Sequence, residues 1–188
     1  MLLLMNCMAE DIFEGYKMEE LAVYQYLDRI IGKPICAIGR VSNMLCLGIG
    51  ENIKVVNQKG REVEKSTYAL HIQSQWRIIN SAKKEILLAS LDMYSPRTDM
   101  DFHNDFDWDS KGNNLFDEKS QIWLKEKMPI YIKKYKVDQW GDLVLFFSNG
   151  ERLQTFNSAS ADSECWRLFM PKSDELHLVV NGLKIEFE

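Results

Sequence analysis

The densest group of side chains that could do chemistry lies in residues 99–118, where carboxylates alternate with aromatic rings. Asp105, Asp107 and Asp109 occupy every second position of this acidic loop, and Gly112 follows three residues later. Hard cations such as calcium bind clustered carboxylate oxygens on a chain that turns sharply. If the acidic loop holds a metal ion, these three aspartates are its candidate ligands.

The acidic loop is similar to an EF-hand calcium loop only in its first half. Ser110 stands at the sixth position, where that loop needs glycine, and Phe116 stands at the twelfth, where it needs glutamate. Phe102, Phe106 and Trp108 interleave with the acids, which indicates a loop that packs against the rest of the protein. We therefore expect no bound metal or cofactor, and we interpret the acidic loop as a surface that recognises another protein with a basic surface.

The sequence contains none of the common catalytic signatures. It has no GxSxG elbow, no HExxH, no glycine-rich phosphate loop and no CxxC. Its histidines, His71, His103 and His177, lie in separate segments. These features favour a non-enzymatic protein-binding protein, for instance an immunity or accessory factor. The alternative is a metal-assisted enzyme or small-ligand binder that uses the loop carboxylates with His71 or His103.

Two stretches, WRIINSAKKE and WRLFMPKSDE, match each other at an offset of 90 residues. Each opens on Trp-Arg and closes on glutamate. A tight hairpin turn in the first stretch would place Arg77 opposite Glu85 on one face of a sheet. The same turn in the second would place Arg167 opposite Glu175, with both tryptophans on the other face. The spacing therefore predicts two cross-strand ion pairs that fix the register.

The match between the two stretches suggests an internal duplication, with half-repeats at about 35–92 and 130–188. A competing interpretation of Arg77 and Arg167 is that they bind an anionic ligand on a concave sheet face, since guanidinium groups hold carboxylates in two-point contacts. Both arginines are therefore candidate binding residues.

Two helices are expected to accompany the strands. The first spans about residues 18–31, with Leu21, Tyr24, Leu27 and Ile31 on its apolar face, and it stops before Pro34. The second spans about residues 114–128 and stops at Pro129. Elsewhere, alternating apolar residues predict strands. The predicted strands are 35–40, 44–50, 68–79, 85–94, 131–137, 142–148, 151–156, 165–170, 176–180 and 183–188.

This pattern predicts an α+β fold of antiparallel β meanders with an N-terminal helix and one central helix. Residues 1–16 are expected to form a flexible extension, and residues 17–188 a single domain. The polar stretch 57–66 is expected to be a loop. Cys36 and Cys46 should lie opposite each other across a hairpin, reduced, buried and without a metal between them.

The net charge of −5 argues against a nucleic-acid-binding protein, because such proteins normally present a basic face to phosphates. Neither a signal peptide nor a membrane-spanning segment is evident, so we expect a cytoplasmic protein that does not act at a membrane. Three motifs, YALHIQSQWRI (68–78), FDWDSKGNNLFDEK (106–119) and ECWRLFM (164–170), resemble those of a family of small bacterial proteins of unassigned function. That resemblance implies a bacterial, cytoplasmic setting and one continuous domain.

Overall fold

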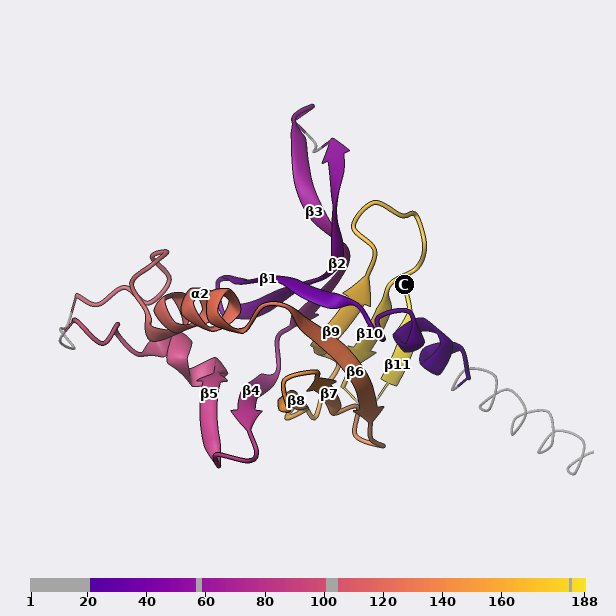
Figure 1. Ribbon diagram of the computed structural model, residues 1–188. Helices are drawn as coiled ribbons and strands as arrows, with labels where there is room; N and C mark the ends of the chain where they lie inside the picture. The colour runs from indigo at the N-terminus through magenta and orange to yellow at the C-terminus, as the bar shows by residue number, and fades with distance from the viewer. Residues whose placement is uncertain (1–20, 57–58, 101–104, 183) are drawn as a thin grey trace, which may run out of the picture.

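The computed structural model describes residues 21–56, 59–100, 105–182 and 184–188. Within these ranges, eleven strands form one antiparallel sheet, accompanied by a helix over residues 21–28, a 3-10 helix η1 and a central helix α2 (Figure 1). The predicted α+β class, with an N-terminal and a central helix, is therefore confirmed. The elements are β1 (Pro34–Val41), β2 (Met44–Val56), β3 (Glu62–Ile72), β4 (Gln75–Asn80), β5 (Glu85–Ala89), η1 (Ser90–Tyr94), α2 (Leu115–Lys127), β6 (Ile130–Val137), β7 (Leu143–Phe147), β8 (Glu151–Phe156), β9 (Glu164–Phe169), β10 (Leu178–Asn181) and β11 (Lys184–Phe187).

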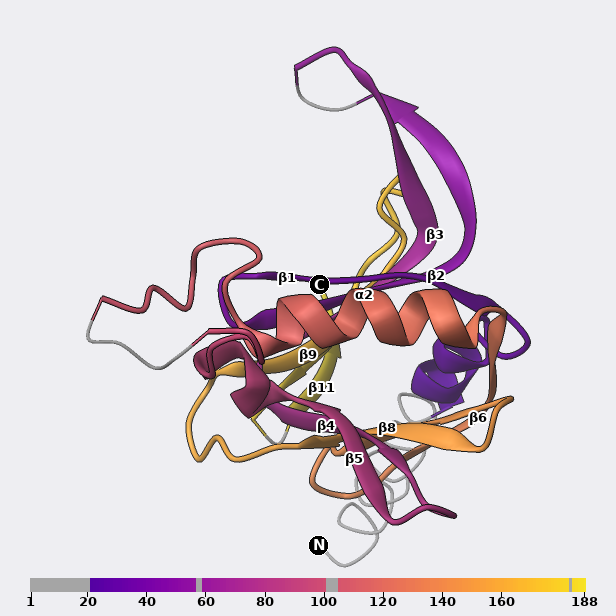
Figure 2. The same cartoon turned by 60° about the vertical axis from the view of Figure 1, so that its left-hand side comes forward.

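The sheet is divided into two arms that enclose one core. Arm A holds β11, β10, β9, β3, β2 and β1 in that order, and arm B continues with β6, β7, β8, β4 and β5. In Figure 2, β1, β2 and β3 of arm A lie above α2, and β4, β5 and β8 of arm B lie below it. Buried apolar residues from both arms form a single cluster. None of the described helices is long and apolar enough to cross a membrane.

The strand order is symmetric when β1–β5 are matched with β6–β10 in chain order. From one end the order is β10, β9, β3, β2, β1, and from the other end it is β5, β4, β8, β7, β6. Each strand of the first series matches the strand at the same place in the second. Each half of the chain therefore contributes three strands to one arm and two strands to the other. At the centre, β1 pairs with β6, and Ile35 lies opposite Ile130. The helix over 21–28 contacts β6 through Tyr24 and Tyr135, while α2 lies against β1.

The hairpin registers repeat at the offset seen in the sequence. Ile78 pairs with Leu88 in arm B, and Leu168 pairs with Leu178 in arm A, so both pairs keep the offset of 90 residues. All four side chains are fully buried. Trp76 and Trp166 are also buried and belong to the core. Residues that match in sequence thus occupy matching positions in the two arms.

The predicted Arg–Glu pairs are wrong, although β4 and β5 are adjacent and antiparallel. Arg77 lies opposite Ala89 instead of Glu85, and Arg167 lies opposite Val179 instead of Glu175. The register follows the buried leucines: full burial of a leucine contributes about 1.5–3 kcal/mol. An exposed cross-strand ion pair contributes only about 0.2–1 kcal/mol. Glu175 lies outside the strands and binds Arg29.

Three predicted boundaries also differ from the structure. The expected strand 68–79 is interrupted at Gln73 and Ser74, where the chain crosses from arm A to arm B. The expected strand 85–94 ends at Ala89 and continues as η1. The expected loop 57–66 is strand from Glu62 onward, because β2 and β3 form a long hairpin; its polar side chains pair across the strands, as Lys54 does with Glu62.

The central helix agrees closely with its prediction, because local signals define it. Asn114 caps α2 by accepting a hydrogen bond from the Asp117 N–H at 2.8 Å, and the helix ends before Pro129. The N-terminal helix buries a different face from the one predicted. Val23, Tyr26 and Leu27 are buried, as is Ile30 in the turn that follows the helix. Of the predicted apolar face only Leu27 is buried, whereas Leu21, Tyr24 and Ile31 are exposed. The predicted extension 1–16 lies outside the described residues.

The two cysteines do not face each other across the β1–β2 hairpin. Cys46 lies opposite Gly39, and Cys36 lies at a bulge in β1, where its sulfur is 3.1 Å from the Ser66 hydroxyl. Both are free thiols, but they are half-buried instead of buried. The turn lies at Ser42 and Asn43, between the paired residues Val41 and Met44, so the register places Cys36 three residues beyond the partner of Cys46.

Candidate functional site

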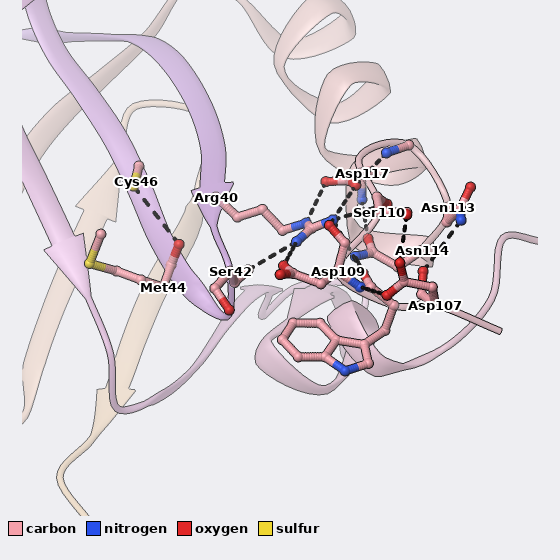
Figure 3. A network of polar contacts seen from close by, with 12 residues as sticks. Arg40, Ser42, Met44, Cys46, Asp107, Asp109, Ser110, Asn113, Asn114 and Asp117 are labelled. Atoms are coloured by element: carbon pink, nitrogen blue, oxygen red, sulfur yellow. Dashed lines mark hydrogen bonds and ion pairs between the residues drawn. The ribbon is translucent and has the colours of Figure 1, made fainter. Parts of the chain in front are cut away.

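One buried arginine organises the acidic loop. Arg40 lies near the end of β1, and its side chain is only 6% exposed (Figure 3). Its guanidinium makes a two-point contact with the Asp117 carboxylate: Nε donates to Oδ1 at 2.9 Å and Nη2 donates to Oδ2 at 2.8 Å. Because Asp117 belongs to the first turn of α2, this pair joins the β1–β2 hairpin to the start of the central helix.

The same guanidinium binds the middle of the loop. Nη1 donates to the Asp109 carboxylate at 3.1 Å and to the Ser42 carbonyl at 3.0 Å. Nη2 lies within 3.3 Å of three successive carbonyl oxygens, those of Trp108, Asp109 and Ser110. A planar group with five donors can satisfy carbonyl groups that would otherwise lack partners. Arg40 therefore fixes the path of the loop backbone as well as two of its carboxylates.

Further contacts order the loop from within. The Asp107 carboxylate accepts the Asp109 N–H at 3.1 Å and the Ser110 hydroxyl at 2.7 Å. The Asn114 amide donates to the Trp108 carbonyl at 2.9 Å. The Trp108 ring packs against Tyr94 of η1, with centroids 4.8 Å apart. The Trp108 contact agrees with the expectation that the loop packs against the rest of the protein.

These contacts keep the loop carboxylates ionised. Burial alone would raise the pKa of Asp117, but the hydrogen bonds from Arg40 and from the Gly112 N–H outweigh it and leave the pKa below its usual value. The Ser110 hydroxyl and the Asp109 N–H lower the pKa of Asp107. Asp107 and Asp117 therefore carry negative charges at neutral pH.

The structure brings together only some of the candidate residues. Asp105, Asp107 and Asp109 are exposed, and Phe106 and Trp108 are half-buried. Phe102 and His103 lie outside the described residues. Arg77, Arg167 and His71 are on strands of the sheet and contact other groups, so the alternative site that combines the loop acids with His71 does not form here. Within the described ranges, no three acidic, histidine or cysteine side chains converge as metal ligands.

We predict that calcium or magnesium at a few millimolar will not raise the melting temperature. The carboxylates of Asp107, Asp109 and Asp117 already accept hydrogen bonds from the protein, so a cation would have to displace these donors. Thermal unfolding with either metal and with chelator, at constant ionic strength, measures the effect. A ligand at one hundred times its Kd would stabilise the fold by about 2.7 kcal/mol. A rise that disappears in Asp105→Asn/Asp107→Asn would contradict this prediction.

Arg40 is the residue of the candidate site that the sequence analysis did not identify. It stands in a turn-like stretch 69 positions before Asp109 and 77 before Asp117, as the hydrogen bonds between them show. No local spacing rule connects residues so far apart. The one hint in the sequence is that a charged residue, Arg40, stands among the apolar residues of a predicted strand, between Ile38 and Val41.

A hollow of about 520 Å³ lies beside Arg40, between the acidic loop, the β1–β2 hairpin and α2. Its polar lining includes Asp109, Lys111, Asp117 and Ser120. The Ser120 hydroxyl is buried and has no hydrogen-bond partner among the described residues. Because Ser120 is only 1% exposed, the exposed side chains of Asp109 and Lys111 form the accessible polar lining of the hollow.

Arg167 is neutralised on the outer face of arm A. It binds the Glu164 carboxylate, with Nε donating at 2.8 Å, and its Nη2 lies 3.5 Å from Glu188. Its Nη1 is 3.1 Å from the His177 ring nitrogen Nδ1. The ring of Phe169 lies between the two histidine rings, with centroids 4.9 Å from His71 and 4.6 Å from His177. Arg167 is thus fully engaged by its own strand neighbours.

We predict that these two histidines make stability fall as pH decreases from neutral. Burial, followed by the charge of Arg167, lowers the pKa of His177, and burial is also the main cause of the lowered pKa of His71. The stabilisation is fully present above the unfolded value of about 6.5 and is lost as pH falls through the folded values. Urea unfolding of His71→Gln/His177→Gln between about pH 7 and pH 5 should show a weaker dependence than the wild type. An unchanged dependence would contradict the assignment.

Comparison of the chain with protein-family models, with curated proteins and with solved structures found no match. The functional argument therefore depends on the site itself. Its main feature is the contact of the buried Arg40 side chain with residues 108–110 and Asp117 of the acidic loop, while Asp105, Asp107 and Asp109 are exposed.

Proposed function

We propose that this protein is a non-enzymatic binding protein that recognises another protein through the acidic loop. The observation that supports the proposal is the Arg40 clamp, which orders the loop backbone while Asp105, Asp107 and Asp109 stay exposed. A loop that is ordered before binding loses less conformational entropy when the partner docks. The partner would be a protein with a basic surface.

The charge of the loop supports this choice of partner. Its ionised carboxylates would attract a basic surface over several ångströms and mainly accelerate association. The hollow beside Arg40 would receive a polar side chain of the partner between Asp109 and Lys111. The metal-assisted alternative has less support, because protein donors occupy the loop carboxylates and His71 lies on β3. An immunity or accessory role in a bacterial cytoplasm is part of this proposal.

Affinity capture from an extract of the source cells tests the proposal. The bait is the whole protein, compared with Asp105→Lys, which reverses one exposed charge that makes no described hydrogen bond. Asp174→Lys is the matched control, since Asp174 is an exposed residue in the loop after β9. A partner that binds the wild type and the control but is lost with Asp105→Lys supports the proposal. Partners retained equally by all three baits would contradict it.

We also propose that the two halves of the chain arose from one duplicated unit whose last two strands exchanged places. The symmetric strand order supports this, as does the common offset of 90 residues in the Ile78–Leu88 and Leu168–Leu178 pairs. The ancestral unit would have comprised a helix followed by five strands.

A further inference from the structure

The outer face of arm B carries two rows of side chains that cross its five strands. The first row contains Lys136, Val144, Gln154, Arg77 and Ala89. The second contains Lys134, Phe146, Arg152, Ile79 and Ile86. Neighbours in each row are directly paired across strands, so they project from the same face. The rows hold four cations and no acid.

None of these four cations forms an ion pair with a described residue. Arg29, Arg40, Arg97 and Arg167 each bind a carboxylate, whereas Arg77 and Arg152 do not. Arg77 donates to the neutral Gln154 side chain at 3.1 Å. The Nε of Arg152 is buried and has no hydrogen-bond partner among the described residues. The protein as a whole is acidic, with a net charge of −5, so these unpaired cations make the outer face of arm B locally positive.

In arm A, the arginine that corresponds to Arg77 is paired with carboxylates. Arg167 corresponds to Arg77, because each follows its buried tryptophan and lies opposite a small apolar residue of the next strand. Arg167 is bound by Glu164 and approached by Glu188. Arg77 has no such partners. The two halves therefore differ in charge at a position where their backbones agree.

Aromatic rings hold the cations of arm B in place. The Lys134 ammonium lies 4.6 Å from the centroid of the Phe146 ring, and the Arg77 guanidinium lies 5.0 Å from that of Phe156. Beside them, a hollow of about 280 Å³ is lined by Arg77, Arg152 and Lys84 together with one acid, Glu85, at its edge. Ile86 at the same edge is 57% exposed. The face thus offers positioned cations next to apolar surface.

We propose that the outer face of arm B is a second interaction surface, and that it binds an extended acidic segment of a partner protein. Cations two residues apart on a strand, such as Lys134 and Lys136, are separated by about 6.7 Å. An extended segment with acids at alternate residues has the same repeat, so its carboxylates can contact both rows at once. The aliphatic parts of the acidic side chains would pack on Phe146, Val144 and Ile79, and the intervening residues of the segment would face away from the sheet.

The geometry favours a protein segment over a nucleic acid. Single-stranded nucleic acids stack their bases on open aromatic faces. Here Lys134 covers Phe146 and Arg77 covers Phe156, so the rings position cations and are not open stacking platforms. Carboxylates can approach these cations without displacing them from the rings.

Titration of the isotopically labelled whole protein with defined peptides tests the proposal. The probe is a peptide of about twelve residues that alternates glutamate with leucine or valine, matched to the strand repeat. Amide signals of the two rows should shift, and the signals of the acidic loop should not. Lys134→Glu/Lys136→Glu should weaken binding by about tenfold or more. Lys125→Glu/Lys172→Glu, with the same charge change at exposed sites outside the two rows, should bind like the wild type.

Three results would overturn the proposal. The first is equal binding of a peptide with lysine in place of glutamate. The second is tighter binding of an oligothymidylate of the same length, which would indicate a nucleic-acid surface. The third is self-association in sedimentation that Lys134→Glu/Lys136→Glu and Asp105→Lys each abolish, which would make a second copy the occupant. Because Asp105→Lys leaves the two rows intact, unchanged peptide binding by that variant separates this surface from the proposed role of the acidic loop.

Discussion

Replacing Arg40 by methionine is expected to lower the free energy of unfolding by about 3–5 kcal/mol, the range typical of removing one partner from a buried ion pair. The loss arises because Asp117 stays partly buried without its guanidinium, and three loop carbonyls lose their donor. For a chain of this length, each kcal/mol corresponds to about 2–4 °C, so the melting temperature should fall by roughly 10 °C. Urea and thermal unfolding measure both quantities.

Two variants distinguish the clamp from a general effect of removing charge. Arg97→Met breaks the ion pair with Asp99, which is exposed, and it should leave stability nearly unchanged. Arg40→Met/Asp117→Leu removes both charges and should recover part of the loss, because no carboxylate remains uncompensated. If Arg40→Met costs no more than Arg97→Met, the loop does not depend on the clamp.

The Arg40 clamp should also weaken in acid. The pKa of Asp117 is lowered in the folded state, so its contribution is fully present above the unfolded value of about 3.9. The contribution disappears as pH falls through the lower folded value. The difference in stability between the wild type and Arg40→Met should therefore shrink below about pH 4.

Replacing either buried tryptophan by alanine is expected to cost about 3–5 kcal/mol. Trp76 and Trp166 occupy matching positions in the two arms and are 2% and 0% exposed, so truncating either leaves a large cavity in the common core. Similar losses in urea unfolding would agree with their equivalent positions. A cost below about 1 kcal/mol for either would mean that the core collapses around the missing ring.

Replacing each tryptophan by phenylalanine should lower the stability by different amounts at the two positions. The Trp166 indole N–H donates to the Gly141 carbonyl at 2.8 Å, and Trp166→Phe leaves that buried oxygen without this donor. The Trp76 indole N–H is buried and has no described partner, so Trp76→Phe removes an unpaired donor along with some volume. Trp166→Phe should therefore cost about 1–3 kcal/mol more than Trp76→Phe. The reverse order would contradict this difference in hydrogen bonding.

The sequence predicted elements whose causes are local. The central helix has an asparagine cap, acids in its first turn, lysines in its last and a proline beyond it, all within a few residues. The predicted hairpin registers were wrong because the Arg–Glu spacing determines the register less strongly than the burial of Leu88 and Leu178 does. That burial depends on a core that the sequence alone does not show. Tertiary packing decided the register.

The candidate site shows the same limit. Alternating acids and aromatics predicted that the acidic loop packs against the rest of the protein, and Trp108 does pack against Tyr94. Arg40 was missed because its partners lie about seventy or more positions away and meet it only through the pairing of β1 with the rest of the sheet. The cationic rows of arm B depend on strand neighbours as distant as Arg77 and Gln154, which a sequence does not place side by side.

The exchange of strands between the two arms has a consequence for synthesis on the ribosome. β3 lies between β2 and β9, so the first half of the chain emerges without the strand that completes its arm. Residues 164–169 must be released before β3 gains that neighbour. Until then, one edge of β3 offers unpaired backbone groups, the usual starting point for aggregation. The nascent first half therefore has to stay protected until translation of the second half is nearly complete.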